Sequence, residues 1–361
     1  MRALTDMGER AQAVREYERC RDALKAALDV EPSTETRALY QALRTFSGPS
    51  IPDSPAPTAL QPPAQRETLQ GLPPACSRLR VGVLPLEAAS RRNEGLAFSL
   101  SQEIATALAR FRWFDVITPV ALLGRPSAST SQRMLKRKQL HYVVDGTVSG
   151  NDEKLQISIR LLDVTQEACP VWSDRFELSV DALDRVNELI TAPVVARIDP
   201  VILFIEGQPK RPQRSGATAL VMQAIPLMYT MEREKYEEAG KLLDQALEAD
   251  PDNAMAAAWA AFWQVFYVGQ GWSHDPRSAF KEAQRLAVKA INIDPDNAEA
   301  LGIYAHICAF LDKDFDSAVY YFDRALRLNP NIAFVWALSA PTYSYIGEPD
   351  LALQRLIATA I

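Results

Sequence analysis

The fold of the C-terminal part of this 361-residue chain can be predicted from one stretch, Phe315-Asp-Ser-Ala318-Val-Tyr-Tyr-Phe322-Asp-Arg-Ala325-Leu326-Arg-Leu-Asn-Pro330. It predicts an amphipathic helix that ends at a proline, with small residues seven positions apart. The same pattern recurs upstream at Ala239, Ala246, Leu247 and Pro251, and at Ala283, Ala290, Ile291 and Pro295. Ala352 follows Ala318 by 34 residues. A 34-residue helix-turn-helix period predicts an α-solenoid over residues 216–361.

One interval of this repeat is longer than the others. Pro251 and Pro295 are 44 residues apart, and we interpret residues 268–276 as a loop inserted between the two helices of that repeat. The turns Asp250-Pro-Asp-Asn253 and Asp294-Pro-Asp-Asn297 are almost identical, which supports the register. Most aromatic side chains at helical spacing are expected to fill the core: Trp259, Trp263, Phe266 and Tyr304. The concave face of the solenoid is expected to bind a peptide or a partner helix.

Residues 80–200 have a different periodicity, which predicts a mixed α/β domain. Strands are predicted at 80–86, 114–117, 142–148, 155–162 and 171–178, and helices at 94–111, 131–140 and 180–198. Residues 155–162 alternate apolar and polar side chains, as expected of a half-buried strand. Residues 151–154 are predicted to form the turn before it.

The N-terminal part combines a short helical module with a proline-rich segment. Apolar residues at steps of three and four predict a helix that ends before Pro32, and Ser33 can begin a second one. Two helices this short need other structure to cover their apolar faces. Residues 47–79 hold eight of the 24 prolines and are predicted to be an extended linker. The expected domains are therefore 1–46, 47–79, 80–200 and 216–361.

Composition excludes several classes of protein. The formal net charge is −6, and residues 201–361 account for it with fourteen Lys/Arg and twenty Asp/Glu. No segment is basic enough to bind nucleic acid by itself. The four cysteines form no C-x-x-C pair, which suits a reducing compartment. Without a 20-residue apolar run or a signal peptide, the chain is expected to be cytoplasmic and not bound to a membrane.

The sequence contains no recognisable catalytic, cofactor or metal motif. Gly240-Lys241 lacks the rest of a P-loop, and the residues from Gly146 to Gly150 do not fit G-x-S-x-G. The histidines are scattered, and His306 is expected to be a satisfied core or surface residue, although it stands where the repeat usually has a small one. Asp145 is interpreted as a turn residue and residues 136–138 as a solvated basic face. We therefore predict no enzyme activity and no cofactor or metal, and the binding residues stay unknown.

Three segments resemble known families. Residues 216–361 resemble tetratricopeptide repeats (TPR), whose arrays bind proteins or peptides. Residues 80–200 resemble the TolB-like amino-terminal α/β domain, through the stretches 81–86, 104–111, 114–117, 142–148, 157–163 and 171–176. Residues 2–44 resemble the end of the bacterial transcriptional activator domain of antibiotic-regulator-type activators, through 8–17, 24–28, 31–33 and 36–40. That family implies a winged helix-turn-helix upstream, so DNA would be contacted only through a domain that this sequence lacks, and both ends of the chain look truncated.

Three functions are compatible with this organisation. The first is a non-enzymatic regulatory protein, namely the signal-receiving and scaffold part of a bacterial transcriptional activator. The second is a stand-alone TPR adaptor, and the third is the accessory region of a signalling protein such as a nucleotide cyclase. The resemblance of residues 2–44 to activators favours the first, while the signal, the partner, the target genes and the oligomeric state stay open.

Overall fold

The computed structural model describes residues 78–122, 139–151, 153–166, 168–208 and 216–360, and five residues nearer the N-terminus. Contacts divide the chain into two units, Met1–Ala75 and Cys76–Ile361. The five described residues of the first unit are all helical: Tyr17, Arg21, Thr36, Arg37 and Tyr40. The rings of Tyr17 and Tyr40 stack with their centroids 4.1 Å apart. The rest of this module and the predicted linker up to residue 77 lie outside the described residues.

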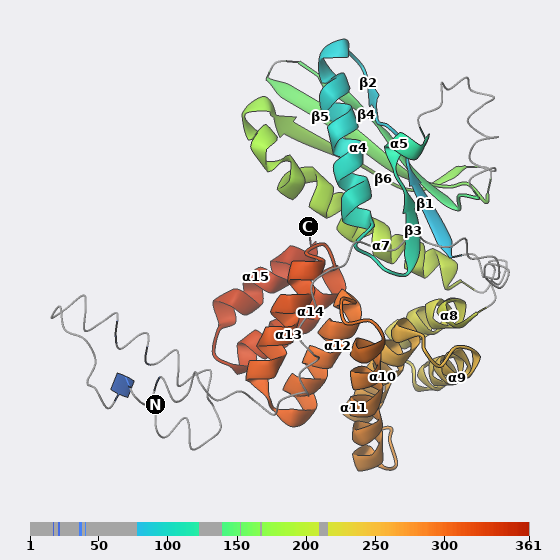
Figure 1. Ribbon diagram of the computed structural model, residues 1–361, viewed down its shortest axis with the longest axis vertical. Helices are drawn as coiled ribbons and strands as arrows, with labels where there is room; N and C mark the ends of the chain where they lie inside the picture. Colours follow the sequence, from blue (N-terminus) through green and yellow to red (C-terminus); the bar gives the residue numbers. More distant parts are fainter. Residues whose placement is uncertain are drawn as a thin grey trace, which may run out of the picture. The chain divides into compact units, whose positions relative to one another are not determined.

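The second unit begins with a mixed β-sheet (Figure 1). Its strands are β1 (Leu79–Val83), β2 (Glu87–Ala88), β3 (Phe114–Ile117), β4 (Tyr142–Gly150), β5 (Lys154–Asp163) and β6 (Cys169–Ser179). The strand order is β3-β1-β4-β5-β6, and β2 also pairs with β4. Pairs β1–β3, β1–β4 and β2–β4 are parallel, whereas β4–β5 and β5–β6 are antiparallel. The strands predicted from the sequence are all present.

Two long helices cover one face of this sheet. They are α4 (Glu94–Leu108) and α7 (Ala192–Glu206), which pack on each other and on the buried side chains of β1, β4 and β5. In β5 the predicted alternation is confirmed, because Leu155, Ile157, Ile159 and Leu161 are at most 4% exposed. The short helix α5 (Pro119–Leu122) contributes to a smaller cluster around Val143, which points to the other face. We call β1 through α7 the α/β part.

Two predictions for the α/β part need correction. Residues 180–198 do not form one helix: a 3-10 turn (Val180–Arg185) and a π turn (Asn187–Thr191) precede α7. Pro193 lies in the first turn of α7, where the missing N–H costs nothing, so the regular helix begins there and continues to Glu206. Asp145 is not a turn residue. It lies within β4 opposite Arg160, whose guanidinium donates two hydrogen bonds of 2.9 and 2.8 Å to its carboxylate.

The remainder of the second unit consists of antiparallel helix pairs (Figure 1). The first helices of the pairs are α8 (Ala217–Tyr229), α10 (Ala254–Gly269), α12 (Ala298–Ile307) and α14 (Ala333–Tyr345). The second helices are α9 (Arg233–Ala249), α11 (Pro276–Ile293), α13 (Phe315–Leu328) and α15 (Pro349–Ala360). We call α8 through α15 the repeat array. The periodic alanines of the sequence are all at most 4% exposed, which confirms that they lie in the packed helix interfaces.

The long repeat differs in detail from its prediction. Only residues 270–275 separate α10 from α11, so the loop is shorter than expected. Part of the extra length extends α11, which has 18 residues where α13 has 14. Pro276 occupies the first turn of α11 and Asp275 caps it by accepting a hydrogen bond of 3.1 Å from the Ser278 amide. A proline directly after a capping aspartate favours a helix start at this point.

The last helix of the array leaves apolar side chains exposed. Leu353, Leu356 and Ile357 of α15 are 57, 49 and 52% exposed. Leu356 follows Phe322 by one 34-residue period, and Phe322 is fully buried in α13. The same repeat position is therefore interior in one helix pair and on the surface in the next.

The α/β part and the repeat array share one hydrophobic core. Buried side chains continue without interruption from the sheet through α7 and α8 into α14. The joint between α7 and α8 is tight, because a Cβ at Gly207 would lie 2.3 Å from the carbonyl oxygen of Met222. No side chain larger than hydrogen fits at Gly207 without movement of the α8 backbone. Contacts accordingly place residues 76–361 in a single unit.

Candidate functional site

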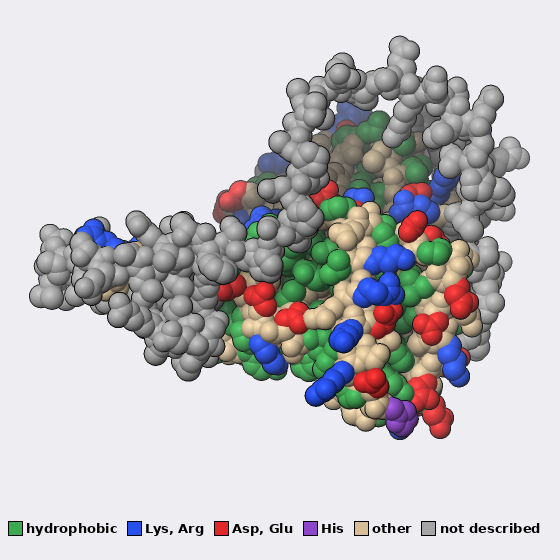
Figure 2. Space-filling view, turned by 60° about the horizontal axis from the view of Figure 1, so that its bottom comes forward, with side chains coloured by type: hydrophobic (Ala, Val, Ile, Leu, Met, Phe, Trp, Pro, Cys, Tyr) green, Lys and Arg blue, Asp and Glu red, His purple; other side chains and the backbone are tan. Residues whose placement is uncertain are grey.

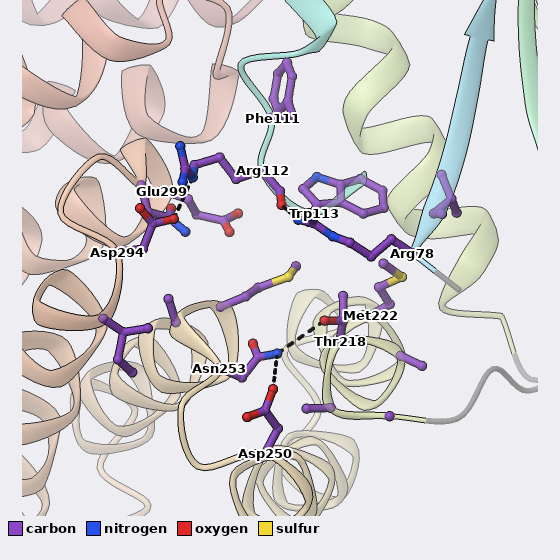
Figure 3. Close-up of a pocket in the computed structure, with 18 of the residues that line it drawn as sticks. Arg78, Phe111, Arg112, Trp113, Thr218, Met222, Asp250, Asn253, Asp294 and Glu299 are labelled. Carbon is purple, nitrogen blue, oxygen red and sulfur yellow. Dashed lines mark hydrogen bonds and ion pairs between the residues drawn. The ribbon is translucent and has the colours of Figure 1, made fainter. Parts of the chain in front are cut away.

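A pocket of about 780 Å³ lies where the α/β part meets the repeat array (Figure 3). Its upper wall in this view comes from the start of β1 and from the turn between α4 and β3. The opposite wall comes from α8 and from the turns that precede α10, α12 and α14. We call this cavity the junction pocket. Its volume lies in the range of roughly 300–1,000 Å³ that is usual for small-molecule sites.

Three arginines line the α/β side of the junction pocket: Arg78, Arg110 and Arg112. The guanidinium of Arg112 reaches across to the array, where its Nε lies 2.6 Å from a carboxylate oxygen of Asp294. Arg78 donates a hydrogen bond to the carbonyl of Arg112, and its Nη1 lies 3.4 Å from a carboxylate oxygen of Asp115. These contacts hold two of the three guanidinium groups in place at the pocket.

The repeated Asp-Pro-Asp-Asn turns form much of the array side. Asn253 and Asn297 are the N-caps of α10 and α12, and their side-chain oxygens each accept a 3.0 Å hydrogen bond from the amide of the third helical residue. The Asn253 amide group also donates to Thr218 of α8 and to Asp250, at 3.4 and 3.3 Å (Figure 3). Asparagine is among the best N-cap residues, so the sequence repeat places two helix starts beside the pocket.

Two partly buried acids, Asp199 and Glu299, lie at the junction pocket, and of the two only Glu299 lines it. Asp199 of α7 accepts a 2.8 Å hydrogen bond from the indole N–H of Trp113. Burial raises the pKa of Asp199 to about 7, although the bond from Trp113 opposes this. Glu299 in the first turn of α12 lines the pocket itself. Burial and the negative charge of Asp199 raise the pKa of Glu299 to about 8. Burial thus shifts the pKa of both acids towards the neutral form.

These raised pKa values predict that stability decreases as pH rises. The ordinary pKa values are 3.8 for Asp199 and 4.5 for Glu299. Between the pH of these ordinary values and about pH 8, the folded chain therefore binds more protons than the unfolded chain. We expect Glu299→Gln to lose less thermal stability than the wild type between pH 5 and pH 8. The measurement is the melting temperature across this range.

A matched control is Glu238→Gln, which changes an exposed glutamate on α9 and should keep the wild-type pH profile. If Glu299→Gln follows the same profile as the wild type, the carboxyl group of Glu299 does not titrate in the way proposed.

Aromatic side chains form a cluster that connects α10, α12 and α14. Trp259 and Phe262 of α10 both contact the ring of Phe334 in α14, with centroid distances of 5.1 and 5.3 Å. His306 of α12 stacks on Phe266 and Phe310 at 5.8 and 5.6 Å, and burial lowers its pKa to about 4. His306 is therefore a neutral side chain within an aromatic cluster. The sequence interpretation of Trp259 as core is confirmed, since it is 2% exposed.

The other aromatics of the repeat lie nearer the surface. Trp263 stacks on Tyr236 and its indole N–H donates a 2.6 Å hydrogen bond to the backbone oxygen of Tyr236, while Tyr304 packs edge-on against Tyr321. Trp263, Phe266 and Tyr304 are all partly buried. They fill the contacts between helices of the array rather than form a separate binding cage.

Residues 1–44 match the family model of the bacterial transcriptional activator domain. No curated protein matches the chain. Among solved structures, MamA is 19% identical over 49% of this chain and 95% of MamA, with a TM-score of 0.28. A thermophilic TPR protein from Thermus thermophilus is 15% identical over 48% of this chain and 83% of its own, with a TM-score of 0.34. TolB from Acinetobacter baumannii is 13% identical over 34% of this chain and 29% of TolB, with a TM-score of 0.26.

The structural similarities add no argument, because all three TM-scores are far below 0.5. The predicted helix pairs of the repeat array and their buried alanines are present in this chain. The resemblances of the array to TPR and of the α/β part to the TolB-like domain stay predictions. In the ranges that the structure describes, no helix is long and apolar enough to cross a membrane. Within the same ranges, no group of three or more His, Cys, Asp or Glu side chains is placed to hold a metal ion.

The structure places the residues considered from the sequence far apart. His141 lies beside β1, where its Nδ1 accepts a 3.0 Å hydrogen bond from the Arg80 amide, and His274 is exposed in the loop before α11. Gly240 lies in α9 against the ring of Trp263. The basic run at 136–138 and the predicted helix 131–140 fall almost entirely outside the described residues. None of these residues lines the junction pocket.

The residues that line the pocket on the α/β side were not among those predicted from the sequence. Arg110, Arg112 and Trp113 follow the end of α4 as the run Arg110-Phe-Arg-Trp113. A cluster of arginine and tryptophan between a helix and a strand was the available signal. It could not be assigned a role, because its partners in the repeat turns lie some 140 to 220 residues further along the chain.

Proposed function

We propose that this chain is the signal-receiving and scaffold part of a bacterial transcriptional activator, without enzymatic activity of its own. The observation that carries this proposal is the match of residues 1–44 to the transcriptional activator domain in a chain that also holds an array of helix pairs. Repeat arrays present extended surfaces to protein partners. Binding of a partner or ligand by the array and the α/β part would then act on a DNA-binding domain through the activator module.

The face of the chain drawn in Figure 2 favours a protein-binding role over direct contact with DNA. On the face drawn in Figure 2, Lys and Arg side chains lie among Asp and Glu side chains and hydrophobic areas, with no large basic field. Nucleic-acid binding needs clustered positive charge, because contacts to phosphates supply most of the affinity. We propose that the chain acts in the cytoplasm and reaches DNA through a separate winged-helix domain.

A transcription reporter tests the activator role. The full chain is fused to a DNA-binding domain whose operator precedes the reporter gene, and a second fusion carries residues 76–361 only. The cut follows the division of the chain into two units, so the second unit keeps its core. We expect transcription to rise with the full chain and to fall to the level of the DNA-binding domain alone with the shorter one. Equal activation by both fusions, or none by the full chain, would refute the proposal.

Direct DNA binding is tested separately by a mobility-shift assay on the purified chain. We expect no sequence-specific complex at about 0.15 M salt, a concentration at which base-specific contacts survive. A tight complex with one DNA sequence and not with others would contradict the proposed need for a separate DNA-binding domain.

A further inference from the structure

We propose that the junction pocket binds a small organic oxyanion, either a carboxylate or a phosphate ester, whose charged group is held by Arg110 and Arg78. This inference goes beyond the regulatory role, because the binding can be measured whether or not the chain acts in transcription. Four observations of the pocket carry it: an arginine that pairs with no residue in the described ranges, partners for all but one of the ionised acids, two helix starts in the lining, and apolar lining residues.

The first observation concerns Arg110. Its side chain is exposed, lines the pocket, and makes no hydrogen bond or ion pair with any residue in the described ranges. The neighbouring Arg78 is oriented by Asp115 and by the carbonyl of Arg112. Arginine presents a rigid planar set of donors that suits carboxylate and phosphate oxygens. Arg110 and Arg78 line the same pocket, so one guanidinium without a partner in the described ranges and one oriented guanidinium are both available to such a group.

The second observation concerns the acids on the array side, which at first sight oppose an anion. Asp294 is paired with Arg112 at 2.6 Å. Asp250 accepts hydrogen bonds from the Asn253 side chain and from the amide of Asp252, at 3.3 and 3.2 Å. Burial raises the pKa of Glu299 to about 8, which favours its neutral form at pH 7. The remaining acid that lines the pocket is Asp252, whose side chain is exposed.

The third observation concerns the starts of α10 and α12. The capping side chains of Asn253 and Asn297 bond the amides of Ala256 and Ala300, the third residue of each helix. The first two residues of both helices line the pocket, and their amides precede the helical hydrogen bonds. Such amides and the helix dipole both favour a negative group nearby. They add to the arginines and do not define the site without them.

The fourth observation concerns what surrounds the charged groups. Phe111, Trp113, Met222 and Met255 also line the pocket and provide aromatic and thioether surface. Ligand sites commonly combine an apolar lining with a few polar groups that fix the orientation. The expected ligand is therefore a small molecule with one oxyanion and an apolar or aromatic body, rather than a free inorganic ion.

The test is equilibrium binding to the purified full chain by titration calorimetry, at constant ionic strength with sodium chloride as the reference. The probes are phenylacetate, which offers a carboxylate, and phenyl phosphate, which offers a phosphate ester. We expect saturable 1:1 binding of at least one probe, and the stronger probe tells which oxyanion the pocket prefers. Absence of saturable binding by both overturns the proposal.

Three variants locate the site. Arg110→Gln should lower the affinity for the probe by at least about tenfold, which is the loss expected for one charge-assisted hydrogen bond. Arg91→Gln removes an exposed arginine elsewhere on the α/β part and should leave binding unchanged. Asp252→Asn removes the exposed acid at the rim and should strengthen binding. Equal effects of the two arginine variants would mean nonspecific attraction. Weaker binding of the anionic probe by Asp252→Asn would mean that Asp252 helps to hold the probe and does not repel it. Either result refutes the proposal. Melting curves confirm that each variant is folded.

Discussion

Replacing Phe322 with alanine is expected to lower the free energy of unfolding by about 3–5 kcal/mol, the range for large-to-small changes at fully buried phenylalanines. Phe322 is 0% exposed and belongs to the core that joins the helices of the array. Truncation removes the apolar contacts of the ring and leaves a cavity that close-packed helices fill incompletely. The measurement is chemical denaturation of the full chain, followed by far-ultraviolet circular dichroism.

The chain contains a matched control for this prediction. Leu356 occupies the same position one repeat later and is 49% exposed, so Leu356→Ala should change the free energy of unfolding by less than about 1 kcal/mol. If both substitutions cost the same, burial in the array does not determine the energetics of this repeat position.

Replacing Gly146 with alanine is expected to destabilise the α/β part by about 3 kcal/mol, at the upper end for overpacked sites. A Cβ at Gly146 in β4 would lie 2.1 Å from the carbonyl oxygen of Ser158 and 3.1 Å from the Cα of Ile159, both in the backbone of β5. The neighbouring strand cannot rotate away as a side chain would. Either strand would have to move, and the ladder hydrogen bonds between them would weaken.

Gly95→Ala is expected to change the stability in the opposite direction when it is measured in the same assay. Gly95 lies in the first turn of α4, is exposed, and has nothing within 4 Å of an added Cβ. Alanine is a better helix former than glycine, so this substitution should raise stability by about 0.5–1 kcal/mol. Destabilisation by both substitutions would show that loss of glycine itself, rather than the backbone contact at Gly146, causes the effect.

Periodicity predicted most of the fold because it reflects local geometry. The alternation at Leu155, Ile157, Ile159 and Leu161 and the alanines at seven-residue spacing are properties of a single strand or helix. The structure differs from the prediction where the local sequence is compatible with more than one kind of secondary structure. Residues 180–198 are apolar enough for a helix, yet Pro193 delays its regular start. Asp145-Gly146 resembles a turn, yet both residues pair with β5 in the antiparallel ladder.

The junction pocket could be predicted only in part, because its walls come from distant segments. The Asp-Pro-Asp-Asn repeats indicated turns, and their asparagines cap helices as residues of this type commonly do. The meeting of Arg112 with Asp294 depends on how α7 and α8 join the sheet to the array. That joint is set by packing around Gly207 and leaves no periodic pattern in the sequence.

The shared core has a consequence for how this protein can be recombined. A chain cut between Glu206 and Ala217, where the sequence suggests a domain boundary, would leave Ile198 and Ile202 on one fragment and Val221 and Ile225 on the other without their common packing. Each fragment would expose an apolar face and tend to aggregate. The exchangeable module is therefore residues 76–361 as a whole. An array taken from another protein could replace α8 through α15 only if its first helix accommodated the end of α7.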